Sequence, residues 1–234
     1  AKRAARPRKA GPRSTGMKKG CNATSEGPNC KAKTGILNIY INKKAIPLTD
    51  IPLIGRHNKM NVMFAVLCAI RLKIPFNKIL KDIKSFENAS HRLEMVALID
   101  QVKFINDSKA TNVDAVYYAL EAIKESIIWI AGGIDKGNDY SILDEWVVQK
   151  VRGIVSLGID NSKIENHFKG KVSLIGHATS MEEAIKKAME FASPGDVVLL
   201  SPACASFDIF HNYEDRGNQF KAAVRSLNLK SASI

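Results

Sequence analysis

The sequence has no apolar run long enough to cross a membrane: its longest, residues 62–70, has nine residues, whereas a helical span needs about 18. It has only four cysteines, and no two of them form a CxxC pair. Neither a disulfide framework nor a zinc site is therefore indicated, and we expect a reducing, cytoplasmic setting without membrane contact. No apolar stretch follows the basic N-terminus, which excludes a secretory signal.

The first 34 residues contain no Val, Ile, Leu, Phe, Tyr or Trp, and they hold ten basic residues against one acid, Glu26. Because such a segment has little to bury, residues 1–35 are predicted to form a disordered basic leader. The other 200 residues carry 25 basic and 22 acidic side chains, so most of the net charge of +12 belongs to the leader. The leader fits a non-native upstream sequence, a targeting tail or a nucleic-acid arm, and we expect no nucleic-acid contact outside it.

Beyond Arg92 the sequence alternates short apolar runs with amphipathic stretches, which predicts βαβ units. Such alternation is typical of an α/β fold with a mostly parallel sheet and helices on both faces. The predicted strands are residues 102–105, 127–131, 153–157, 172–175 and 197–200, and the predicted helices are residues 113–123, 142–149, 181–192 and 219–227. Because ligands bind beyond the carboxyl ends of parallel strands, we expect the chemically informative residues to follow these strands.

Residues 36–90 show another pattern. Short apolar alternations broken by prolines and a glycine predict strands and turns up to residue 55. Apolar residues at three- and four-residue spacing predict a helix that begins near Asn58, and Pro75 opens a second, shorter helix.

Six polar side chains follow the predicted strand that ends at Ile105, in the string NDSKATN (residues 106–112). Asp, Ser, Thr and Asn all cap helix N-termini, so a purely structural role is one interpretation. A single cap does not need Lys109, and a lysine beside a helix N-terminus also suits a carboxylate or phosphate. Both interpretations remain open on the residues alone.

Two more strings follow predicted strands. GGIDKG (132–137) combines a glycine turn with Lys136, and it is not a Walker loop because Asn138 stands where the phosphate-binding lysine must be. SPACASFD (201–208) leads into YEDRG (213–217), and its small residues permit close backbone approach. Cys204 has small apolar neighbours and no adjacent histidine, which favours a packed thiol over a nucleophile.

Two clusters precede the predicted sheet. GRHNKMN (55–61) places Asn58 and Asn61 one helical turn apart, where two amides suit a base or a ribose, although a helix cap is the plainer interpretation. HRLE (91–94) contains Arg92, which suits a phosphate or an ion pair with Glu94.

Taken in chain order, from GRHNKMN to SPACASFD with YEDRG, the five strings resemble the Mur ligase family of ATP-dependent, amide-bond-forming enzymes, over about residues 36–229. NDSKATN and SPACASFD resemble the corresponding strings of the family members that add D-glutamate, whereas strings like GRHNKMN and HRLE are shared more widely in the family. The resemblance implies a Rossmann-like C-terminal, D-glutamate-binding domain at residues 91–234. It also implies that residues 36–90 are the end of the family's central ATPase domain.

The resemblance implies roles for ten residues. At ATP it implies Asn58 and Asn61 for the adenine, Arg92 for the phosphates and Asp107 for the ribose; around D-glutamate it implies Lys109, Thr111, Lys136, Ser206, Phe207 and the backbone near Tyr213. Among these, Lys109 and Arg92 are the expected catalytic residues, because cations stabilise the charge that builds up during acyl transfer.

The implied reaction joins D-glutamate to UDP-N-acetylmuramoyl-L-alanine through an acyl phosphate, in peptidoglycan synthesis, with ATP and Mg²⁺ in the complete enzyme. No string here matches the family's UDP-binding domain, Walker loop or magnesium ligands. We therefore expect this chain, a monomer, to be inactive alone. The alternatives are a non-catalytic binding module and a gene fragment with a basic tail.

Overall fold

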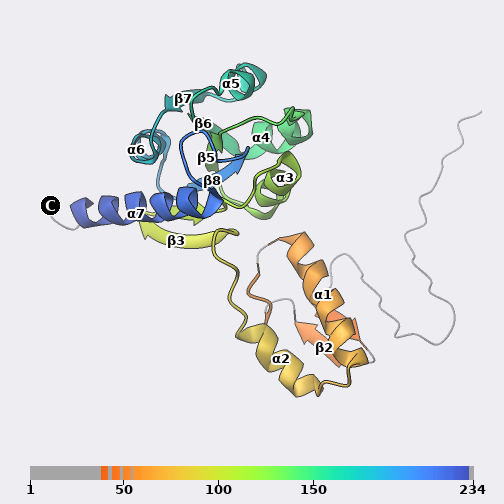
Figure 1. The fold of residues 1–234 in the computed structure, drawn as a ribbon. Helices are drawn as coiled ribbons and strands as arrows, with labels where there is room; N and C mark the ends of the chain where they lie inside the picture. The colour runs from red at the N-terminus through yellow and green to blue at the C-terminus, as the bar shows by residue number, and fades with distance from the viewer. Residues whose placement is uncertain (1–37, 42–43, 48–49, 54, 232–234) are drawn as a thin grey trace, which may run out of the picture.

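The computed structural model describes residues 38–41, 44–47, 50–53 and 55–231 (Figure 1). The predicted basic leader lies outside the described residues. Within them the chain forms a small unit, residues 38–84, and a larger unit built on a sheet, residues 94–231, which we call the sheet unit. Among the described helices, none is long and apolar enough to cross a bilayer.

Six strands form the sheet, in the spatial order β3-β4-β8-β5-β6-β7 (Figure 1). β3 runs antiparallel to β4, and the remaining neighbours are parallel. The strands are Glu94–Ile99 (β3), Val102–Asn106 (β4), Ile127–Gly132 (β5), Val151–Leu157 (β6), Leu174–Ala178 (β7) and Val197–Ala203 (β8). The prediction of an α/β fold with a mostly parallel sheet is confirmed.

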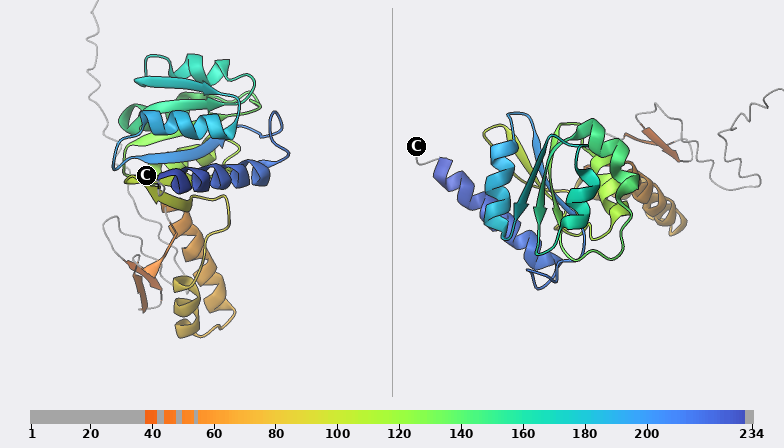
Figure 2. Two further views of the ribbon diagram at one scale, coloured as in Figure 1. Left: turned by 90° about the vertical axis from the view of Figure 1, so that its left-hand side faces the viewer. Right: turned by 90° about the horizontal axis from the view of Figure 1, so that it is seen from above.

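Helices cover both faces of this sheet (Figure 2). One face carries the 3₁₀ helix η2 (Tyr140–Leu143) and the helices α3 (Val113–Ala122), α4 (Asp144–Lys150) and α5 (Ser162–Phe168); the other carries α6 (Met181–Phe191) and α7 (Tyr213–Ser231). Buried strand residues alternate between the two cores: Trp129 packs on the α3 side, and Ile128 and Ile130 pack on the α6 side. Each such buried side chain contributes roughly 1.5–3 kcal/mol to folding, so two dry cores hold the strand ends in place.

The small unit contains a two-stranded antiparallel hairpin and two helices. Its elements are β1 (Asn38–Ile41), β2 (Lys44–Pro47), α1 (Arg56–Arg71) and α2 (Phe76–Lys84). Ile46, Ile51, Val66 and Ile79 form its core, beside an apolar cavity of about 310 Å³. The two views of Figure 2 show this unit projecting from the sheet unit, so most of its surface is turned away from the sheet.

Three elements differ from the prediction. β3 was not predicted, because a bulge between Met95 and Ala97 interrupts its alternation. α5 was not predicted, because its seven residues are too few for a clear helical period. α7 begins at Tyr213 instead of residue 219, since the amide of Asp215 donates to the Asn212 side chain at 2.7 Å and caps the helix there. The string YEDRG is therefore the first part of a helix.

Candidate functional site

Loops from three parallel strands meet at the carboxyl edge of the sheet. NDSKATN begins at the last residue of β4, GGIDKG begins at the last residue of β5, and SPACASFD begins with the last three residues of β8; β8 lies between β4 and β5. A short bridge joins the last two loops: the amide of Ile134 donates to the Ala205 carbonyl at 2.9 Å, and the amide of Ala205 donates back at 3.2 Å. The topology thus brings the three strings together, as the strand-end argument predicts.

Arg216 of α7 holds two of these loops. Its side chain is 1% exposed and donates to the Ser108 hydroxyl at 3.0 Å, the Ser108 carbonyl at 2.9 Å and the Cys204 carbonyl at 3.2 Å. Burial lowers the pKa of the Arg216 guanidinium to about 10, so it stays charged at neutral pH. The Ser108 hydroxyl in turn donates to the Tyr213 carbonyl at 2.8 Å. Arg216 is therefore a positioning residue for NDSKATN and SPACASFD.

Asn106 ties the linker before β3 to α7. Its amide nitrogen lies 3.0 Å from Nδ1 of buried His91 and 3.1 Å from Glu94, and it donates to the Gly217 carbonyl at 3.3 Å. Glu94 pairs with Lys221 at 3.3 Å, so the sequence alternative of an Arg92–Glu94 pair is not what the structure shows. A Cβ atom at Gly217 would overlap the His91 ring, which explains the glycine inside α7.

A cleft of about 260 Å³ lies between the start of α1, the linker before β3, the end of β4 and one side of α3. Four of the predicted site residues line it: Asn58, Arg92, Asp107 and Lys109. Arg92 and Lys109 are exposed, so both cations are accessible to an anionic ligand. His57 and Tyr118 add aromatic rings to the same wall, with centroids 5.0 Å apart.

Asp107 forms part of this cleft and is only 7% exposed. The Ser201 hydroxyl donates to one carboxyl oxygen at 2.9 Å, and the amide of Leu93 donates to the other at 3.1 Å. Burial raises the pKa of the Asp107 carboxyl to about 7, although these hydrogen bonds and the charge of Arg92 act in the opposite direction. The carboxyl is held rigidly and can accept from, or donate to, a ligand hydroxyl near neutral pH.

The other predicted substrate residues lie around the joined GGIDKG and SPACASFD loops. Lys136 is exposed, Ser206 is buried and Phe207 is 69% exposed. Lys109 reaches toward this side as well, because its Nζ lies 5.2 Å from the centroid of the Tyr213 ring. The structure therefore places two cations, Lys109 and Lys136, on loops of the same edge of the sheet.

The GGIDKG turn is locked from within. Gly133 has a φ of 118°, and a Cβ there would overlap the Ala205 carbonyl. Asp135 accepts from the Tyr140 hydroxyl at 2.7 Å and from Lys163 at 3.0 Å. Burial raises the pKa of the Asp135 carboxyl, but these and backbone hydrogen bonds outweigh it and hold that pKa below its ordinary value. The carboxylate is thus occupied by structural partners, and Lys136 beside it is the cation that faces solvent.

Cys204 is fully buried, with the Tyr140 hydroxyl 3.3 Å from its sulfur. Burial raises the pKa of its thiol, so the thiolate is disfavoured. The interpretation of Cys204 as a packed thiol is confirmed.

Asn61 and Thr111, which were predicted as site residues, do not line the cleft, and the structure shows which residue caps α3. Asn61 lines the apolar cavity of the small unit, three residues after Asn58. Thr111 is half-buried, and its amide donates to the Lys109 carbonyl at 2.9 Å. Asn112 alone caps α3, accepting from the amide of Ala115 at 2.8 Å. Capping thus explains one residue of NDSKATN, and Asp107 and Lys109 remain directed to the cleft.

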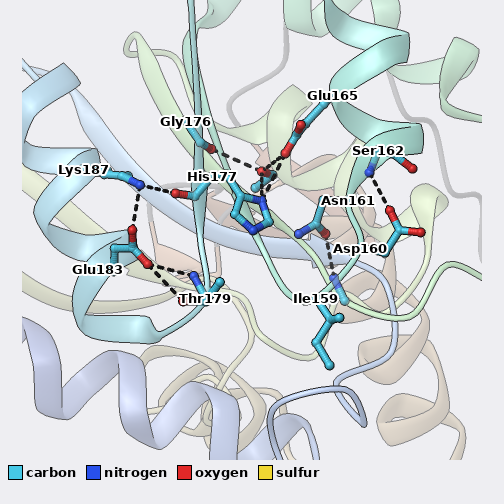
Figure 3. Close-up of polar contacts among 12 residues, drawn as sticks. Ile159, Asp160, Asn161, Ser162, Glu165, Gly176, His177, Thr179, Glu183 and Lys187 are labelled. Carbon is cyan, nitrogen blue, oxygen red and sulfur yellow. Dashed lines mark hydrogen bonds and ion pairs between the residues drawn. The ribbon is translucent and has the colours of Figure 1, made fainter.

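A second polar cluster lies beside the edge strand β7, between β6, β7 and α5 (Figure 3). Nδ1 of His177 lies 3.3 Å from the Ser156 hydroxyl and 3.2 Å from Glu165, and Ser156 also donates to Glu165. A hydrolytic triad needs serine and carboxylate on opposite ring nitrogens, whereas both contact the same nitrogen here. Ser156 is fully buried as well, so this cluster is structural.

Sequence reasoning missed three residues of the site: His57, Tyr118 and Arg216. Tyr118 belongs to no motif, and its signal, an aromatic residue on an amphipathic helix, is the same as that of a core residue. Arg216 lies in the quoted string YEDRG, but only its burial shows that it joins two loops. Among the described residues, no group of three or more His, Cys, Asp or Glu side chains is placed to hold a metal ion.

Comparisons with known proteins show which proteins this chain is similar to. Residues 91–204 match the family described as Mur ligase, glutamate ligase domain. The UDP-N-acetylmuramoylalanine--D-glutamate ligase of Cytophaga hutchinsonii is 53% identical over 178 residues, which are 76% of this chain and 40% of that relative. The chain therefore spans well under half the length of this curated relative.

Solved structures share the fold. The UDP-N-acetylmuramate-alanine ligase MurC from Thermotoga maritima has a TM-score of 0.57 at 17% identity, over 75% of this chain and 39% of that one. A bifunctional folylpolyglutamate synthase/dihydrofolate synthase from Yersinia pestis, solved with AMPPNP and a manganese ion, has a TM-score of 0.54 at 18% identity, over 81% of this chain and 43% of that one. At such identity these structures support the fold alone.

Proposed function

Because residues 91–204 match the family described as Mur ligase, glutamate ligase domain, we propose that the chain belongs to this family and forms the D-glutamate-binding part of a ligase that joins D-glutamate to UDP-N-acetylmuramoyl-L-alanine. The observation that carries this proposal is the pair of cations, Lys109 and Lys136, on loops of one sheet edge and within the residues that match the family model. D-Glutamate brings two carboxylates, and cations with hydrogen-bond donors are the groups that bind them.

The cleft supports a nucleotide beside this site. Members of the family use ATP, and the cleft offers an amide at Asn58, a carboxyl at Asp107 and cations at Arg92 and Lys109. These groups suit a base, a ribose hydroxyl and phosphates respectively. Asn61 lines the other cavity, so the base contact in this conformation falls to Asn58.

The glutamate side of the proposal rests on Lys136, Ser206 and the loop amides. Lys136 faces solvent beside a turn that Asp135 and Gly133 make rigid, so its charge is available to a carboxylate. In the proposed reaction the amine of D-glutamate attacks the acyl phosphate of the UDP-linked substrate, a C–N bond forms and phosphate leaves. Arg92 and Lys109 stabilise the charge on the departing phosphate, and the edge loops hold the amine in line.

The proposal places this reaction in the cytoplasm, in peptidoglycan synthesis, with the protein as a monomer. Mg²⁺ would accompany ATP, and its ligands would come from outside the described residues.

A binding experiment on the 234-residue chain tests the proposal. Isothermal titration with D-glutamate should show binding that Lys136→Ala weakens by at least about tenfold, because a charge-assisted contact is lost. The same substitution should leave ATP affinity unchanged. Lys124→Ala removes an exposed lysine at the opposite end of the sheet and should bind D-glutamate as the wild type does.

Equal loss of D-glutamate and ATP affinity in Lys136→Ala would contradict the assignment of Lys136. Binding of L-glutamate as tight as that of D-glutamate would point to a general carboxylate site instead.

A further inference from the structure

The cleft has an aromatic wall that none of the motifs accounts for. His57 of α1 and Tyr118 of α3 lie with ring centroids 5.0 Å apart and an interplanar angle of 45°. Both line the cleft with Asn58, Arg92 and Lys109. Tyr118 is 43% exposed, so its ring is available at the cleft surface.

Tyr118 is held rigidly although it is exposed. Its ring meets Tyr117 edge-on, at 5.5 Å and 90°, and Tyr117 packs in turn on Trp146 at 6.0 Å. A ring oriented by its neighbours before a ligand arrives costs little entropy on binding. Ala115 and Ala119, on the same side of α3, also line the cleft, and their small side chains leave the Tyr118 ring free to meet a flat ligand.

The two kinds of group in the cleft come from different elements. The rings lie on the helices α1 and α3, whereas Arg92 and Lys109 lie on the loops before β3 and after β4. Burial lowers the pKa of His57, with Glu121 acting against this and Arg92 with it, so the imidazole beside Tyr118 is neutral at pH 7. Uncharged rings suit an aromatic base, and the loop cations suit phosphates.

We propose that Tyr118 stacks on the base of the nucleotide bound in this cleft and so determines how strongly the base, as opposed to the phosphates, contributes to binding. This inference rests on the proposed function, in which the cleft takes ATP. The alternative is a structural role, in which the ring only packs α3 against His57 of α1.

The experiment compares a ligand that has a base with one that does not. ATP and inorganic tripolyphosphate are titrated into the 234-residue chain and into Tyr118→Ala, Tyr118→Phe and Tyr118→Leu. Stacking predicts that Tyr118→Ala weakens ATP binding by about tenfold and leaves tripolyphosphate binding unchanged. Tyr118→Phe should restore the ATP affinity because it keeps the ring, whereas Tyr118→Leu should not. Arg92→Ala is the control, and it should weaken both ligands.

The Phe-against-Leu contrast decides the question even where tripolyphosphate binds too weakly to measure. Equal ATP affinity in all four proteins, or in the Phe and Leu variants, overturns the stacking role. Parallel loss of both ligands in Tyr118→Ala identifies a structural role and also overturns it. Absence of ATP binding to the wild-type chain overturns the nucleotide part of the proposed function together with this inference, whereas the other outcomes leave that function intact.

Discussion

Two buried ionisable side chains, Asp107 and Arg216, lie at the carboxyl edge of the sheet. Arg216 has donors matched by carbonyls and a hydroxyl, and it contacts no carboxylate among the described residues. Asp107 accepts two hydrogen bonds, yet burial still raises the pKa of its carboxyl to about 7. Arg216 therefore holds two loops of the site together, and Asp107 makes the stability of the protein depend on pH.

The contribution of Asp107 to stability should fall as the pH rises through the range in which its carboxyl titrates. The carboxyl has a pKa of 3.8 when exposed and about 7 when folded, so the folded state binds more protons between these values. The contribution of Asp107 to the free energy of unfolding therefore decreases from about pH 4 to pH 7, by up to roughly 4 kcal/mol. Urea unfolding of the wild type and Asp107→Asn across this range measures the difference.

The asparagine variant should lack this pH slope, because its amide does not titrate. Asp114→Asn changes an exposed carboxylate of the same cleft and should keep the wild-type slope. Parallel profiles for the wild type and Asp107→Asn would show that burial does not perturb Asp107.

Arg216→Met should destabilise the protein by about 3 kcal/mol, because two buried carbonyls and one hydroxyl lose their donor. Chemical unfolding monitored by circular dichroism measures this change. Arg225→Met, on the exposed side of the same helix, should stay within about 0.5 kcal/mol of the wild type. Similar values for the two variants would refute the positioning role of Arg216.

At the scale of elements, α7 holds the loops of the site in position. Its first turns carry Tyr213, Arg216 and Gly217, which contact NDSKATN, SPACASFD and His91 respectively. The sequence predicted a helix only from residue 219, because its apolar period begins there, while the preceding turn is polar and packs through hydrogen bonds. β5 was predicted to within one residue, since strands buried on both faces read as continuous apolar runs. β8 was predicted to begin at its observed first residue, but it continues three residues further, through Ser201, Pro202 and Ala203.

Gly217→Ala should be destabilising in spite of helix propensity. Alanine stabilises a helix interior by about 1 kcal/mol relative to glycine, but the added Cβ overlaps His91, for a net loss of about 2 kcal/mol. In a His91→Ala background the same substitution should instead stabilise the protein by up to about 1 kcal/mol. Thermal unfolding of the four proteins measures the cycle, and a loss of the same size in both backgrounds would exclude the overlap as its cause.

At the scale of the whole molecule, the small unit and the sheet unit have separate cores. The cleft lies where α1 meets α3, and the His57–Tyr118 contact belongs to that junction. The stability of the sheet unit should therefore depend little on the small unit, whereas the cleft needs both.

Residues 88–234 by themselves should unfold cooperatively within about 3 °C of the sheet unit in the full chain, since the deletion removes only surface contacts worth about 1 kcal/mol. This range keeps Asn88, whose side chain donates to the Arg92 carbonyl. Differential scanning calorimetry of both proteins measures the midpoints. A drop of 10 °C or more, roughly three times that allowance, would show that the two units form one cooperative core.

The sequence by itself determined the fold class and the edge of the sheet to which the polar strings belong, and it predicted four of the residues that line the cleft. Strand periodicity and polar strings at strand ends are local signals in the sequence. Because the strands are parallel, their carboxyl ends lie at one edge of the sheet, and this predicts where the polar strings meet. Only the tertiary structure decided that Arg216 joins two loops, that Asn61 lies apart from Asn58 and that Tyr118 faces the cleft. These facts depend on which segments pack together in space, and burial, which sets the pKa of Asp107, exists only after that packing.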